Sequence, residues 1–239
     1  MEQQPSRADP ANAISPLLRR SALTEKTEPW PARSKELTPE DLVFGWPADK
    51  WEDYRHAERP DQIEKGIAQA RGWLAEWIRF QRPDCPGFIF YGEVGRGKTG
   101  GALLLALQAA RAGCSVLYVT AATMIADVNS TEYHRRDGET QAEVKRRFSA
   151  PEVLIVDDVC ARSYTGPERE FFLDLVRGRQ GEGKITIQTT NLILNTDEGE
   201  SLYIQFLDGR VLSSYKGWRV DATKWGPSLR GRAENVSPL

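Results

Sequence analysis

The residues with the clearest chemical meaning form a glycine-rich stretch, Gly92-Glu93-Val94-Gly95-Arg96-Gly97-Lys98-Thr99, followed by Gly100. Glycines at this spacing let the backbone curl so that successive N–H groups point at phosphate oxygens. Lys98 is placed to reach the β- and γ-phosphates of a nucleotide, and Thr99 to offer its hydroxyl to Mg²⁺. The pattern predicts a P-loop that binds a nucleoside triphosphate with the residues from Gly92 to Gly100.

The segments on either side of this loop fit the same interpretation. The apolar run 87–91 predicts a strand, and the run 102–107 predicts a helix. The N-terminus of such a helix adds a favourable dipole for a bound anion. This context disfavours the alternative, a merely flexible glycine-rich turn.

Two aspartates, Asp157 and Asp158, follow the buried strand predicted at 153–156. A carboxylate at the end of such a strand can hold Mg²⁺ through its water shell, and the ion offsets the charge of the phosphates. We therefore expect Asp157 to join Thr99 at the metal, on a strand beside the P-loop strand. Asp158 is expected to orient or polarise an attacking water. The alternative is that both aspartates merely end a strand.

A third polar group, Thr189-Thr190-Asn191, follows the strand predicted at 184–189. The carboxyl ends of neighbouring parallel strands lie at one edge of a sheet, so Asn191 is expected near the P-loop. There it would hydrogen-bond the γ-phosphate or the water. In isolation the same three residues are also a common strand exit and helix cap.

The elements that must position these residues alternate between strand and helix, which predicts an α/β fold with a mostly parallel sheet flanked by helices. A further strand is predicted at 115–120, and helices are predicted from near 122, over 139–148 and from Pro167. An earlier helix is predicted from Asp61, as its cap, to Gln81, with its tryptophans packed on the sheet.

Bulk properties narrow the class of protein. The 239 residues suffice for one sizeable α/β domain plus a tail. A net charge of −2 and a pI of about 5.9 exclude a surface coated in positive charge. No apolar run approaches the ~20 residues of a membrane span, and no signal peptide is recognisable, so we expect a cytoplasmic protein without a membrane partner.

Residues 1–45 are rich in proline and predict a flexible N-terminal segment before a folded domain at 46–239.

Taken together, four ordered segments resemble the AAA+ ATPases of the DnaC helicase-loader and IstB transposition-helper group. They are 90–99, 117–120, 154–159 and 189–192, and the resemblance covers roughly residues 45 to 230. It implies the AAA+ form of the P-loop NTPase fold and ATP with Mg²⁺ as cofactors. It also implies the following roles: Walker A for Lys98 and Thr99, Walker B for Asp157 and Asp158, sensor 1 for Asn191, and sensor 2 for Arg230.

Two departures from the family pattern bear on hydrolysis. The acidic pair is often Asp-Glu in the family, whereas here the second residue is Asp158, whose side chain is one methylene shorter. The family often carries an arginine finger four residues after the arginine that matches Arg210, and here that position is Ser214. Three alternatives remain: Arg210 takes that role, Lys216 substitutes poorly, or the finger is absent. Slow hydrolysis is therefore expected.

A basic cluster suggests contact with single-stranded DNA, as for an insertion near this point in related loaders. It comprises Arg135, Arg136, Lys145, Arg146 and Arg147. The alternative is a solvated helix with intrahelical pairs such as Glu143 with Arg147.

The function that the resemblance implies is ATP-gated loading of a replicative helicase onto single-stranded DNA, with homo-oligomers possible in this family. An IstB-like transposase helper and a weakly hydrolysing scaffold or inhibitor of a helicase remain alternatives.

Overall fold

The fold was analysed in a computed structural model, which describes residues 38–55, 60–80, 86–133 and 140–225. The chain divides into two compact units, Met1–Glu36 and Leu37–Leu239, and all described residues belong to the second. Residues 38–45, which composition assigned to the N-terminal segment, already belong to this unit, and Val43 is buried there.

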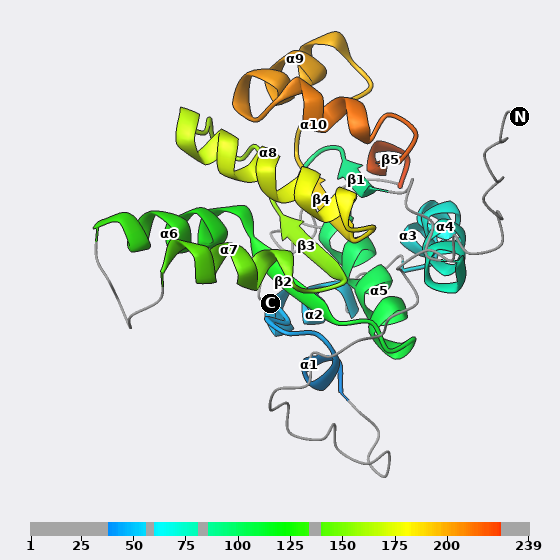
Figure 1. Cartoon of the computed structure of the whole chain (residues 1–239). Coiled ribbons are helices and arrows are strands. Elements are labelled where there is room, and N and C mark those ends of the chain that lie inside the picture. Colours follow the sequence, from blue (N-terminus) through cyan, green and yellow to red (C-terminus); the bar gives the residue numbers. More distant parts are fainter. Residues whose placement is uncertain (1–37, 56–59, 81–85, 134–139, 226–239) are drawn as a thin grey trace, which may run out of the picture. The chain divides into compact units, whose positions relative to one another are not determined.

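The described helices surround a small sheet (Figure 1). In chain order they are α1 (Pro39–Leu42), α2 (Ala48–Arg55), α3 (Pro60–Gly66), α4 (Ala68–Phe80), α5 (Lys98–Arg111), α6 (Ala121–Tyr133), α7 (Gln141–Ser149), α8 (Gly166–Gly181), α9 (Asp197–Phe206), α10 (Gly209–Ser214) and the short 3-10 helix η3 (Ala222–Lys224).

The described strands form one five-stranded, fully parallel sheet in the order β2-β3-β4-β1-β5. The strands are β1 (Gly87–Tyr91), β2 (Val116–Thr120), β3 (Val153–Asp157), β4 (Ile185–Thr190) and β5 (Arg219–Asp221). The predicted parallel α/β fold is confirmed. The short edge strand β5 was not predicted, because three residues give too little periodicity to detect.

The strand order corrects one prediction about the site. The strand that ends in Asp157 was expected beside the P-loop strand β1, but β4 lies between them and pairs with both. Asp157 nevertheless reaches Thr99, at the start of α5, with 2.9 Å between their side-chain oxygens. The inserted strand β4 therefore carries its own side chains into the centre of the site.

Each face of the sheet packs against its own set of helices, because alternate strand residues point to opposite faces. Phe88 and Phe90 of β1 pack in a core with α3, α4 and α5. Ile89 and Tyr91 pack in a second core with α6 to α10. Figure 1 shows these two groups of helices on opposite sides of the sheet.

The long helix expected from Asp61 to Gln81 is interrupted after Gly66. The structure has α3 and α4, separated at Ile67, and Asp61 lies inside the first turn rather than at the cap. A side chain on Gly66 would meet the indole of Trp225 at 2.0 Å, so a close contact explains the glycine. The tryptophans pack as expected: Trp73 stacks on Phe88 with ring centroids 6.1 Å apart.

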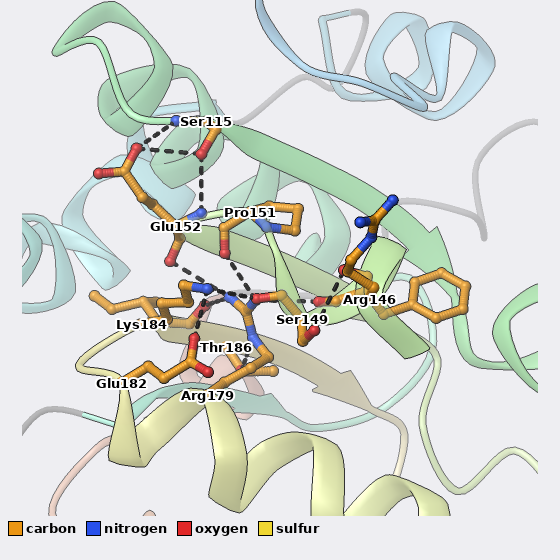
Figure 2. Close-up of polar contacts among 11 residues, drawn as sticks. Ser115, Arg146, Ser149, Pro151, Glu152, Arg179, Glu182, Lys184 and Thr186 are labelled. Carbon is orange, nitrogen blue, oxygen red and sulfur yellow. Dashed lines mark hydrogen bonds and ion pairs between the residues drawn. The ribbon is translucent and has the colours of Figure 1, made fainter. Parts of the chain in front are cut away.

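A buried arginine fastens the amino ends of the central strands (Figure 2). Arg179 of α8 is 0% exposed. Its guanidinium donates to the carbonyls of Pro151 at 2.7 Å and Ile185 at 2.6 Å, which precede β3 and begin β4, and to the hydroxyl of Thr186 at 2.9 Å. Further carbonyl acceptors are those of Phe148, Ser149 and Glu152.

This arginine stays charged at neutral pH. Burial lowers the pKa of Arg179 to about 10, while Tyr215 and Glu182 act in the opposite direction. A planar guanidinium offers five donors in a fixed fork, so one side chain can satisfy carbonyls from the end of α7, the start of β3 and the start of β4.

No helix among the described residues is both long and apolar enough to cross a lipid bilayer.

Arg179→Met is expected to lower the free energy of unfolding by at least about 3 kcal/mol, because several buried carbonyls lose their donor at once. Urea unfolding followed by far-ultraviolet circular dichroism measures this loss. Arg177→Met is the matched control, since Arg177 is exposed on the same helix, and a surface change of this kind stays within about 0.5 kcal/mol. Equal stabilities of the two variants would contradict the assignment.

Candidate nucleotide-binding and catalytic site

The P-loop leaves β1 and turns directly into α5. Gly97 is the N-cap of α5 and has a φ of 86°, in the left-handed region that glycine adopts without strain. No side chain caps this helix. The first backbone N–H groups of α5 are therefore available to an anion, together with the positive end of the helix dipole.

Two cationic side chains of the loop bind within the loop itself. The ammonium of Lys98 is buried and donates to the carbonyls of Gly92 and Glu93, both at 2.8 Å. The guanidinium of Arg96 forms an ion pair with the Glu93 carboxylate, with Nε at 2.9 Å. Carbonyl oxygens hold an ammonium more weakly than phosphate oxygens do, so Lys98 is poised to exchange them for a phosphate.

The carboxylate of Asp157 lies at the centre of the site and is 1% exposed. Its Oδ1 accepts from the hydroxyls of Thr99 at 2.9 Å and Thr189 at 2.5 Å. Its Oδ2 accepts from the hydroxyl of Tyr118 at 2.6 Å and from the ammonium of Lys50 at 2.7 Å. Two strands and two helices thus converge on one charged group.

These donors keep Asp157 ionised. Burial alone raises the pKa of the Asp157 carboxyl, but the hydrogen bond and charge of Lys50, with the hydrogen bonds of Thr189 and Tyr118, outweigh it and hold the pKa below its ordinary value. For the phenol the effect is opposite: burial and the neighbouring Asp157 charge raise the pKa of Tyr118 far above its usual range. The phenol therefore remains a donor.

Thr189 fixes the direction in which the Asp157 carboxylate points. Its hydroxyl accepts from the backbone N–H of Asp158 at 2.9 Å, and it donates to Asp157. Because the hydroxyl accepts one hydrogen bond and donates its only proton, its orientation is fixed. Thr189 lies on β4, the strand inserted between β1 and β3, so the sheet order itself supplies this contact.

The second aspartate faces the opposite way, toward solvent. Asp158 is exposed, and its φ of 62° places a non-glycine residue in the left-handed region. The amide nitrogen of Asn191 donates to its carboxylate at 2.9 Å. The structure thus brings two separately predicted site residues, Asp158 and Asn191, together at the same edge as Thr99 and Asp157. Strained backbone at such a position is common in functional sites.

Three contributors to the site were missed by sequence reasoning: Lys50, Tyr118 and Thr189. They lie 107, 39 and 32 residues from Asp157 in the chain. Tyr118 and Thr189 sit inside predicted strands, where an apolar or small polar residue is ordinary. The signal available for Thr189 was its place in the Thr189-Thr190-Asn191 group at a strand exit.

The two arginines expected from the resemblance have different outcomes. Arg210, near the start of α10, is 61% exposed and forms a bidentate pair with Asp208, with Nε at 3.0 Å and the terminal nitrogen at 2.9 Å. The described contacts thus join it to its own cap residue. Arg230 lies outside the described residues. Ser214 donates to the Val211 carbonyl at the end of α10.

The basic cluster is divided by its contacts. Lys145 pairs with Asp174 of α8 at 3.5 Å, and Arg147 pairs with Asp127 of α6 at 3.0 Å. Arg146 is exposed, and Arg135 and Arg136 lie outside the described residues. Glu143, which the alternative interpretation paired with Arg147, instead forms a capping box with Thr140.

The described side chains fit a nucleotide with Mg²⁺. The uncapped start of α5 offers N–H groups to phosphate oxygens. The hydroxyl of Thr99 and the carboxylate of Asp157 are the hard oxygen ligands that Mg²⁺ prefers, and they lie 2.9 Å apart. The buried Asp157 carboxylate already attracts a cationic partner in Lys50.

This parallel sheet, its P-loop and its paired carboxylates define a P-loop NTPase of the AAA+ kind. The family model described as IstB-like ATP binding protein matches residues 50–201. The chain belongs to this family of ATP-binding proteins.

A curated relative supports the assignment. The ATP-binding protein Rv3427c in an insertion sequence of Mycobacterium tuberculosis strain H37Rv is 32% identical over 147 residues, which are 60% of this chain and 55% of that protein. The chain thus matches about half the length of this relative.

Solved structures share the fold. DnaI has a TM-score of 0.58 at 18% identity, covering 80% of this chain and 99% of that one. The DnaC helicase loader has a TM-score of 0.51 at 20% identity, covering 66% of this chain and 89% of that one. Domain III of the Thermotoga maritima replication initiation protein DnaA has a TM-score of 0.53 at 15% identity, covering 74% and 67%.

Thr189→Val is expected to bind ATP but to need more Mg²⁺ and to turn over about tenfold or more slowly, since partners that orient metal ligands have effects of this size. The measurement is the Mg²⁺ dependence of steady-state phosphate release. Thr190→Val is the control, because its hydroxyl instead accepts from the Leu192 N–H at 3.3 Å. Unchanged Mg²⁺ dependence in Thr189→Val would show that this hydroxyl does not orient Asp157.

Proposed function

We propose that this ATP-binding protein hydrolyses ATP and uses the nucleotide state to load a replicative helicase onto single-stranded DNA. The observation that carries the hydrolysis part is the pair Asp158 and Asn191, joined at 2.9 Å. It lies at the same sheet edge as the Thr99 and Asp157 oxygens, which are also 2.9 Å apart. One pair can hold a metal, and the other can hold a water.

The residues divide the work as follows. The N–H groups at the start of α5 and the ammonium of Lys98 bind phosphate oxygens. Thr99 and Asp157 hold Mg²⁺, which when bound with ATP offsets the phosphate charge. Asp158 orients the attacking water and accepts its proton. Asn191 holds the Asp158 carboxylate and donates toward the γ-phosphate.

Turnover is expected to be slow for two reasons. The Asp158 side chain reaches less far than the glutamate common in the family. Arg210 is held by Asp208, so acting as a finger for a neighbouring copy requires breaking a bidentate ion pair, and Ser214 supplies no guanidinium. A finger contributes orders of magnitude in rate, which favours a switch over a fast motor.

Asp158→Asn is expected to lower the turnover number about 100-fold or more while ATP affinity is retained, because the amide cannot accept the proton of the water. Phosphate release and binding of a fluorescent ATP analogue are the two measurements. Asp197→Asn serves as the control, since Asp197 is an exposed residue in the first turn of α9. Full turnover in Asp158→Asn would remove Asp158 from the mechanism.

The helicase part of the proposal draws on solved structures. DnaI and the DnaC helicase loader share the fold, and the match covers 99% of the DnaI chain. The segment before residue 38, rich in proline, is the candidate for partner binding, since such segments can order on a partner.

A transposase-helper role is the second candidate. The insertion-sequence relative favours it, because that similarity is one of sequence and not of fold alone. Both candidates use the same ATP site, so they differ in the partner.

Contact with single-stranded DNA is part of both candidates. Among the described residues, the exposed Arg146 and the half-exposed Lys145, 3.5 Å from Asp174, offer positive charge to a phosphate backbone. Arg147 is engaged with Asp127 and is assigned to packing between α6 and α7. Arg135 and Arg136 remain part of the proposal from sequence.

Capture of a purified partner by the immobilised full-length chain separates the two candidates. A replicative helicase of the same host is expected to be retained in the presence of ATP and Mg²⁺, and to be lost with Lys98→Ala, which cannot hold the phosphates. Retention of the transposase instead would favour the second candidate. Retention of neither would exclude both partners.

A further inference from the structure

A lysine from the beginning of the domain reaches the metal-binding carboxylate. The ammonium of Lys50, on α2, lies 2.7 Å from Oδ2 of Asp157, although the two residues are 107 positions apart in the chain. It also lies 5.9 Å from the ring centroid of Tyr118, whose hydroxyl donates to the same oxygen. The Lys50 side chain is 34% exposed, whereas that of Asp157 is 1% exposed. The Lys50 side chain therefore lies between the Asp157 carboxylate and solvent.

The backbone before α2 holds this lysine in place. The Phe44 N–H donates to the Val116 carbonyl at 3.0 Å, and the Tyr118 N–H donates to the Phe44 carbonyl at 2.9 Å, which adds one parallel bridge to the free edge of β2. Gly45 follows with a φ of 74°, where a side chain would lie 2.4 Å from the Tyr118 carbonyl.

Packing then orients the helix. Trp46 and Trp51 pack edge to face with ring centroids 5.1 Å apart, and both contact the core beneath α5. Because the bridge and the indoles fix the start and one face of α2, Lys50 is directed at the end of β3 by the fold and not by its own flexibility.

The chemistry of the position is that of a cation site. A buried carboxylate is stable only with a cation or several donors around it. Lys50 supplies that cation in the structure. Thr99 and Asp157 are also the oxygen ligands expected for Mg²⁺. The Lys50 ammonium lies 2.7 Å from Oδ2 of Asp157, while Thr99 donates to Oδ1 of the same carboxylate, so the ammonium and a metal ion would share one carboxylate. An ammonium and a divalent ion that bind the same carboxylate repel one another strongly in a partly desolvated site.

We propose that Lys50 is a built-in counter-ion of Asp157 that competes with Mg²⁺. Without Mg²⁺ and nucleotide it neutralises the carboxylate and keeps the site closed. When the metal binds with ATP, the Lys50 ammonium leaves Asp157. Since Lys50 is on α2, its release removes one contact between α2 and the end of β3. The inference rests on the proposed binding of ATP with Mg²⁺ at this site.

The test compares Mg²⁺ titrations of nucleotide binding. Lys50→Met keeps the length and apolar stem of the side chain but removes its charge. With a fluorescent ATP analogue at fixed concentration, the Mg²⁺ concentration for half-maximal binding is expected to fall about threefold or more, the effect of losing one partly exposed ion pair. Lys50→Arg retains the competitor and is expected to stay near wild type. Lys65→Met on α3 is the matched control, because Lys65 is exposed.

A second measurement uses the wild-type chain and does not depend on a variant folding. Acylation of Lys50 by an amine-reactive ester, followed by mass spectrometry, is expected to speed up severalfold when Mg²⁺ and a non-hydrolysable ATP analogue are added. Lys65 is expected to react at an unchanged rate. Slower acylation of Lys50 would mean that it moves onto the phosphates, which overturns the proposal.

The outcomes separate this inference from the function beneath it. If Lys50→Met needs as much Mg²⁺ as wild type, or more, while the nucleotide still binds, competition is wrong and ATP binding stands. If wild type binds no nucleotide at any Mg²⁺ concentration, the proposed function fails, and with it this inference.

Discussion

A negative charge buried at the end of a strand is the constraint on which the site depends. The Asp157 carboxylate is 1% exposed, and a charge so placed must be surrounded by donors or cations. Hydroxyls from α5, β2 and β4 and an ammonium from α2 meet that requirement. Arg179 presents the opposite charge at the other end of the same strands, bound to carbonyls that precede β3 and begin β4. Arg179 therefore links β3 and β4 at their amino ends, and the Asp157–Thr189 hydrogen bond links them at their carboxyl ends.

Much of this arrangement follows from the sequence, for physical reasons that differ by residue. The P-loop and Asp157 could be predicted because each follows an apolar strand directly, and parallel strands bring their carboxyl ends to one edge. The meeting of Asp158 with Asn191 follows from the same rule. Lys50 and Tyr118 could not be predicted, because nothing local distinguishes a surface lysine or a strand tyrosine from one that binds a carboxylate far away in the chain. Arg179 was equally hidden, since an arginine near the end of a helix ordinarily points to solvent.

The order of the strands explains why the missed residues matter. If β1 and β3 were adjacent in the sheet, β4 would not lie beside β1 and β3 together, and Asp157 would lack the hydrogen bond from Thr189. With β4 between them, Thr189 bonds both the Asp157 carboxylate and the Asp158 backbone. Asn191, two residues further along, reaches the Asp158 side chain. One strand exit therefore positions both aspartates, and a shift of β4 would displace both carboxylates together.

The left-handed backbone at Asp158 gives a physical account of the departure from the family's acidic pair. Aspartate and asparagine tolerate a positive φ better than longer side chains do, because their short polar groups bond locally. Here the φ is 62°, and the Asn191 amide holds the carboxylate. A glutamate would reach closer to a water but would have to adopt the same strained backbone and would lose the fit to Asn191. The shorter residue thus suits this turn at the expense of reach, which supports the proposal that turnover is slow.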